Sequence, residues 1–161
     1  MPAFEVSELA LATAYHEAGH AVVALSLGRA IEKLTIVRNS IRLGVVQLAK
    51  GRRGRKQDFF ENEALILLGG LAAEARYTGE YNWLGAQQDL SALRRLSMAR
   101  ADNPQQVERL ERRLLDKTEH LLQQSGHWES VESIVQELCR HQSLSGRAAR
   151  HLFDEALKRS S

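Results

Sequence analysis

Residues 13–27 read TAYHEAGHAVVALSL, and this stretch decides the fold. Small and apolar residues dominate it. Ser7 stands in front of it as a typical helix N-cap, and Glu8 suits the first turn of a helix because its charge complements the helix dipole. Gly28 follows directly and is a typical helix end. The sequence therefore predicts a largely buried helix from Ser7 to about Leu27.

This helix carries a His-Glu-x-x-His motif. His16 and His20 are four residues apart, so about 40° separates them around the helix axis. Their imidazoles project from one face, one turn apart, which suits two nitrogen ligands of one zinc ion. Glu17 lies beside them and can take a proton from a water at the metal. Two surface histidines would show the same spacing, but the apolar flanks predict burial, and buried polar groups need partners.

A catalytic zinc ion usually has three protein ligands. Residues 21–119 contain no histidine, which favours a carboxylate as the third ligand. The downstream candidates are Glu61, Glu63, Glu74, Glu80 and Asp89.

Glycines in helical segments indicate how these helices pack. Gly19 inside a helix costs up to about 1 kcal/mol relative to alanine, which suggests the close approach of another backbone. The small residues at 69–73 would let a second helix pack closely on the zinc-binding helix.

The rest of the chain predicts a mainly helical α+β fold. Strand-like runs at 31–37 and 43–49 flank Arg38-Asn39-Ser40, which predicts a hairpin. A basic loop at 51–56 (GRRGRK) precedes predicted helices at 58–77 and 86–101, with a loop at 78–84 between them. Apolar periodicity and helix-start signals predict a C-terminal helical bundle of three helices, at 104–124, 128–141 and 146–158.

Composition limits the class of protein. The chain has 161 residues, enough for one modest core, and its 22 basic and 20 acidic residues give no reason to expect nucleic acid. The single cysteine, Cys139, excludes an internal disulfide and fits a reducing cytosol. The longest apolar stretch, 64–73, is too short to span a membrane, and the N-terminus lacks a signal-peptide pattern. We therefore expect a cytoplasmic protein.

Three segments together resemble the peptidase domain of the FtsH-type AAA zinc metalloproteases. They are TAYHEAGHA at 13–21, LLGGLAAE at 67–74 and GAQQDL at 85–90, in the order that this family shows. The resemblance implies zinc as the cofactor, with His16, His20 and Asp89 as its ligands and Glu17 as the catalytic carboxylate. It also places Glu74 near the metal, and we interpret this residue as one that orients a ligand histidine.

The resemblance also implies a polypeptide substrate, bound by strand addition along Gly44, Val45, Val46 and Gln47. The sequence has no GxxxxGK phosphate loop. We therefore expect residues 1–161 to form one stand-alone peptidase domain, with a zinc-site half at 1–101 and C-terminal helices at 102–161.

The expected activity is zinc-dependent hydrolysis of flexible or unfolded polypeptides, without an ATPase of its own. The alternative is a metal-binding regulatory module that acts with a separate partner. The organisation of the family suggests a separate ATPase or adaptor as a partner, and a homo-oligomer as the assembly.

Overall fold

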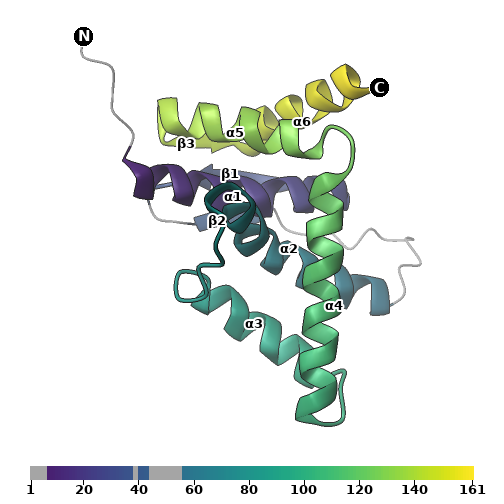
Figure 1. The fold of residues 1–161 in the computed structure, drawn as a ribbon. Coiled ribbons are helices and arrows are strands. Elements are labelled where there is room, and N and C mark those ends of the chain that lie inside the picture. The colour runs from purple at the N-terminus through teal and green to yellow at the C-terminus, as the bar shows by residue number, and fades with distance from the viewer. Residues whose placement is uncertain (1–6, 38–39, 44–55) are drawn as a thin grey trace.

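The computed structural model describes residues 7–37, 40–43 and 56–161. Helix α1 (Glu8–Ser26) runs through the middle of the molecule and contacts α2, α4, α5, α6 and the sheet (Figure 1). The elements that follow it are β1 (Ile31–Thr35), β2 (Ser40–Leu43), α2 (Lys56–Thr78), α3 (Gln87–Met98), α4 (Pro104–Gln123), α5 (His127–His141), β3 (Ser143–Ser145) and α6 (Gly146–Ser160). The predicted mainly helical fold with one small sheet is confirmed.

The limits and the burial of α1 agree with the sequence signals. The Ser7 hydroxyl accepts a hydrogen bond from the Ala10 backbone N–H at 3.1 Å, which caps the helix. Gly28 after the helix has a φ of 78°, a left-handed conformation that glycine adopts most easily. Every residue from 14 to 25 is buried except His16, which is half-buried. The helix is therefore central to the core, as its apolar sequence predicts.

Helices α1 and α2 cross with their backbones in contact. A Cβ atom on Gly69 would lie 2.8 Å from the Gly19 carbonyl oxygen and 3.0 Å from Val23 Cγ2. The same crossing leaves no room for a Cβ on Gly19, which would lie 2.5 Å from the Ala73 Cβ. The close approach predicted from these small residues is confirmed.

The sheet has the strand order β2-β1-β3 and is antiparallel throughout. The hairpin prediction is correct, but its limits were wrong. Strand β1 ends at Thr35 rather than Val37, and Ser40, which pairs with Thr35, belongs to β2, so the second strand begins at Ser40 rather than at Leu43. Residues 44–49 lie outside the described part of the chain. The third strand, β3, was not predicted; Leu144 within it pairs with Leu34 of β1.

The C-terminal helices are built onto the N-terminal ones. Helices α5 and α6 cover one side of α1, while α4 runs along the molecule from α3 to α5 and packs on α2 (Figure 1). None of the helices in the described ranges has the length and apolar character needed to cross a membrane.

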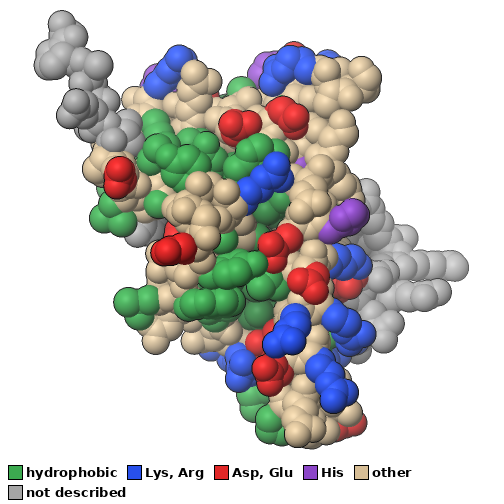
Figure 2. Space-filling model, viewed as in Figure 1, with side chains coloured by type: hydrophobic (Ala, Val, Ile, Leu, Met, Phe, Trp, Pro, Cys, Tyr) green, Lys and Arg blue, Asp and Glu red, His purple; other side chains and the backbone are tan. Residues whose placement is uncertain are grey.

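A stack of aromatic rings ties α5 to α1 and α2. The ring of Tyr15 lies 4.0 Å from that of Tyr77, nearly parallel to it, and 5.7 Å from that of Trp128. The Arg76 guanidinium lies over Trp128, 4.3 Å from the ring centroid, as in a cation–π contact. Hydrophobic side chains reach the surface between α5 and α3 (Figure 2). Because Tyr15 directly precedes His16, this stack fixes α1 where the histidine motif begins.

Replacing Gly69 with alanine tests the helix crossing. In an ordinary helix interior this change is stabilising by about 1 kcal/mol. Here the added methyl group meets the backbone of α1, so we expect the free energy of unfolding to fall by about 1–3 kcal/mol instead. Urea denaturation followed by circular dichroism measures the change. A Gly69→Ala protein more stable than the wild type would contradict the observed crossing.

Candidate metal centre

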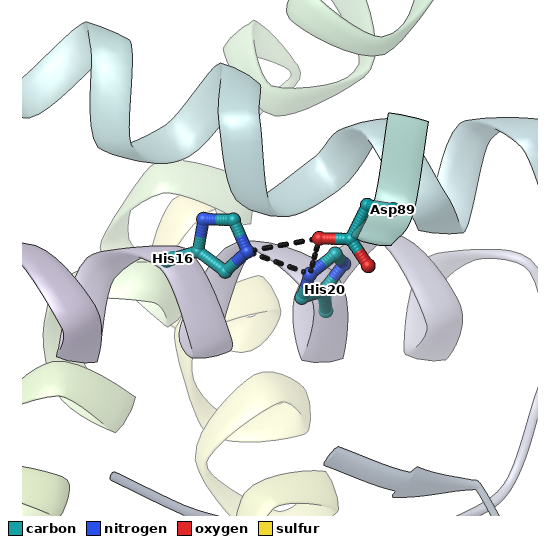
Figure 3. Close-up of side chains that lie close together, drawn as sticks. All are labelled: His16, His20 and Asp89. Atoms are coloured by element: carbon teal, nitrogen blue, oxygen red, sulfur yellow. Dashed lines mark hydrogen bonds and ion pairs between the residues drawn. The ribbon is translucent and has the colours of Figure 1, made fainter. Parts of the chain in front are cut away.

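Two helices bring three ligand-type side chains together. His16 and His20 project from α1, and Asp89 comes from the first turn of α3 (Figure 3). Asp89 Oδ2 lies 3.1 Å from the Nε2 atom of each histidine, and the two Nε2 atoms are also 3.1 Å apart. The three atoms therefore form a nearly equilateral triangle.

This triangle fits a zinc ion. Zinc holds nitrogen and oxygen ligands at about 2.0–2.1 Å, and in a tetrahedral site neighbouring ligand atoms are then about 3.3–3.4 Å apart. The observed separations of 3.1 Å are close to that value. Two imidazoles and one carboxylate are also a common ligand set of catalytic zinc. The residues present therefore suit a zinc ion with one position left open.

Each imidazole has a polar group close to its Nδ1 atom. The Nδ1 atom of His20 lies 2.7 Å from the Ile66 carbonyl oxygen on α2, to which its N–H donates. The Nδ1 atom of His16 faces Glu74 Oε1 at 3.6 Å, an ion-pair distance that is longer than a hydrogen bond. A proton held on Nδ1 leaves the Nε2 lone pair free for a metal. Glu74 therefore lies beside His16, and its role as an orienting residue stays a prediction.

Gly70 makes room for the two imidazoles. A Cβ atom there would lie 2.5 Å from the Nε2 atoms of both His16 and His20. Any larger residue would occupy space beside the candidate ligand atoms. Sequence reasoning missed this role because it assigned the Gly69-Gly70 pair only to helix packing.

The charges of the cluster are coupled. Burial lowers the pKa of His16, but the carboxylates of Asp89 and Glu74 outweigh it and raise this pKa to about 9. Burial likewise raises the pKa of Asp89, but its hydrogen bonds to the two histidines hold it well below its usual range. Without metal, the site therefore contains an ionised carboxylate against a protonated His16 at neutral pH. A metal ion would have to displace that proton.

Glu17 has the features of a reactive carboxylate. Its side chain is buried, with 2% of the residue exposed, and within the described ranges its Oε2 atom has no hydrogen-bond partner. Burial raises the pKa of Glu17, and the nearby His20 and His16 only partly offset this effect. A buried carboxylate oxygen without a partner is costly, and such costs are typical of functional sites.

The other candidate carboxylates lie elsewhere. Glu61 forms an ion pair with Lys117 at 2.9 Å, and Glu63 forms one with Arg29. Glu80 is exposed in the loop after α2. Among the five candidates, only Asp89 has an oxygen within reach of both histidine Nε2 atoms. The predicted substrate-binding residues Gly44, Val45, Val46 and Gln47 lie outside the described part of the chain.

Comparison with known proteins shows which family this chain resembles. The sequence profile of Peptidase family M41 matches residues 6–102, which include His16, Glu17, His20, Glu74 and Asp89. The ATP-dependent zinc metalloprotease FtsH of Pelobacter propionicus is 39% identical over 89 residues, which cover 53% of this chain and 14% of that protein. The FtsH of Caulobacter vibrioides is 41% identical over 85 residues, 50% of this chain and 14% of that protein. FtsH 1 of Rhodopirellula baltica is 38% identical over 92 residues, 55% of this chain and 13% of that protein. The matches thus span about one seventh of these relatives.

The titration of His16 tests the electrostatics of the metal-free site. We expect its imidazole to titrate near pH 9, because two carboxylates stabilise the charged form. Proton NMR of the imidazole resonances in chelator-treated protein measures the midpoint. In Asp89→Asn the midpoint should fall markedly, because burial lowers the pKa of His16 and one of the two carboxylates that raise it has been removed. An unchanged midpoint near 6.5 in both proteins would contradict the observed contacts.

Proposed function

The chain belongs to peptidase family M41, and on that premise we propose that it is a zinc-dependent endopeptidase that cleaves flexible or unfolded polypeptides without ATP. One observation carries this proposal. Three candidate ligand atoms lie 3.1 Å from one another, beside a buried glutamate whose Oε2 atom has no partner in the described structure.

We assign His16, His20 and Asp89 as the residues that hold the zinc ion. The Ile66 carbonyl and Glu74 orient the two imidazoles, and Gly70 keeps the space beside their Nε2 atoms open. When bound, zinc supplies Lewis-acid chemistry: it polarises a peptide carbonyl and makes water easier to deprotonate.

Glu17 moves the proton in this proposal. Its carboxylate accepts a proton from the attacking water and then gives it to the nitrogen of the departing amine. The raised pKa of Glu17 suits both steps, because a general base works best when its pKa lies nearer the working pH. Burial, the cause of this shift, also keeps competing solvent away from the carboxylate.

The substrate binds beside the sheet in this account. Strand β2 pairs only with β1 in the described structure, so it forms one edge of the sheet, and it leads directly into residues 44–47. We propose that Gly44, Val45, Val46 and Gln47 add an extended substrate chain to this edge.

We further propose that residues 1–161 act as one unit, in which the aromatic stack joins the C-terminal helices to the zinc-site half. The matched relatives are named as ATP-dependent proteases. A separate ATPase or adaptor would deliver folded substrates to this chain.

Cleavage of an unfolded protein by wild type and Glu17→Gln tests the proposal. The substitution keeps the shape of the side chain and removes its basicity. We expect cleavage without ATP by the wild type, and a rate at least about 100-fold lower for Glu17→Gln. Zinc content, measured on both proteins by mass spectrometry, should be equal.

The control is His16→Ala, which should lose both zinc and cleavage. Equal zinc in wild type and Glu17→Gln, with no cleavage by either, would contradict an autonomous peptidase. That result would support a metal-binding module that works with a partner.

A further inference from the structure

A second concave site lies away from the metal centre. It is a cleft of about 860 Å³ between the start of α2, the end of α3 and the first half of α4, which we call the α2–α3–α4 cleft. Its volume is within the range of sites that bind ligands. Its apolar lining consists of Phe60, Ala64, Leu96, Ala101, Leu110 and Leu114.

Arginines dominate the charge around this lining. Four arginines contribute to the cleft, Arg100, Arg109, Arg112 and Arg113, against two acidic residues, Glu61 and Asp116. Glu61 is already paired with Lys117. Figure 2 shows Lys and Arg side chains over the part of the molecule where α4 lies, with Asp and Glu side chains among them. The cleft therefore combines an apolar floor with a positively charged rim.

Two of these arginines are available for a ligand. Arg109 and Arg113 are one turn apart on α4 and exposed, and the ion pairs that the described acidic residues of this region form are with Arg94, Arg112 and Lys117 instead. Arg112, by contrast, lies 3.8 Å from Glu108. Arginine binds carboxylates with paired, directional hydrogen bonds, so Arg109 and Arg113 suit acidic side chains.

Helices α2 and α3 each carry residues of both the cleft and the candidate metal centre. Asp89 and Leu96 lie on α3 seven residues apart, which is about 10 Å along a helix axis. Gly70 and Ala64 are six residues apart on α2, or about 9 Å. An extended polypeptide covers such distances with about three residues. A peptide of about twelve residues is longer than either of these separations along the helix axes.

We propose that the α2–α3–α4 cleft is an exosite that binds an acidic, partly apolar segment of the substrate polypeptide. Apolar side chains of the segment cover the floor, and its carboxylates bind Arg109 and Arg113. The inference rests on the proposed peptidase function, and it makes unfolded chains with acidic stretches the preferred substrates.

Direct binding is measured first, on the zinc-loaded Glu17→Gln protein, so that the probe is not cut. The probe is a fluorescein-labelled 12-residue peptide of Leu and Glu, and its anisotropy gives the Kd. We expect the double variant Arg109→Glu with Arg113→Glu to raise the Kd at least about tenfold. A peptide with Gln in place of Glu should bind the protein with both arginines intact as weakly as the acidic peptide binds the double variant. Arg147→Glu with Arg159→Glu is the matched control, since both residues are exposed on α6, away from the cleft.

Cleavage then tests the link to catalysis. Two fluorogenic peptides share one cleavable segment, and one of them carries the acidic tail. With wild type, the tail should lower the KM about tenfold and leave kcat unchanged. The Arg109/Arg113 double variant should lose this advantage and still cleave the peptide without the tail. If the charge reversal disturbs folding, the neutral double variant Arg109→Gln with Arg113→Gln takes its place. It should also lose the lower KM and still cleave the peptide without the tail.

The outcomes separate the two proposals. Equal binding by the double variant and the wild type, or a tail that binds without changing the KM, would overturn the exosite. A wild type that cleaves neither peptide would instead contradict the proposed peptidase function, and with it a role of the cleft in substrate selection.

Discussion

The backbones of α1 and α2 touch at Gly19 and Gly69, and the geometry of the candidate metal centre depends on this contact. The crossing brings the Ile66 carbonyl within hydrogen-bond distance of His20 and places Glu74 opposite His16. One residue further along α2, Gly70 leaves the space that the Nε2 atoms need. A single methyl group at these positions would separate the helices or displace the imidazoles. Packing and chemistry are thus set by the same few glycines.

The charge of the centre is arranged for a cation. The Asp89 carboxylate has two histidine nitrogens at the same distance, while Glu74 adds a second negative charge behind His16. In the metal-free protein a proton on His16 partly balances these charges, which explains its raised pKa. The buried Glu17 oxygen remains without a partner among the described residues. Most buried polar side-chain atoms in the described core have a hydrogen-bond partner, whereas this oxygen has none. Such an exception is expected of functional sites.

Local signals in the sequence predicted the parts of the structure that depend on neighbouring residues. The cap at Ser7, the end at Gly28 and the burial of α1 follow from short patterns, as does the position of both histidines on one face. The limits of β2 did not follow, because strand register depends on pairing with β1. Strand β3 has only three residues and forms only where the chain returns to β1.

The candidate site was predictable only in part, because some of its residues come together only through the packing of separate helices. Spacing within one helix identifies His16 and His20, but it leaves five carboxylates as candidates for the third ligand. Asp89 is 69 residues after His20 and reaches it only through the packing of α3. The role of Gly70 is likewise a property of two helices in contact, since nothing beside it in the sequence indicates an imidazole.

X-ray absorption spectroscopy at the zinc edge tests the central claim most directly. On zinc-loaded wild type, we predict four nitrogen and oxygen neighbours at about 2.0–2.1 Å, with the scattering pattern of two imidazoles. In Asp89→Asn one oxygen neighbour should be lost or replaced by water, with both imidazoles retained. A sulfur neighbour at about 2.3 Å, or a spectrum with no imidazole, would place the metal elsewhere and contradict the account.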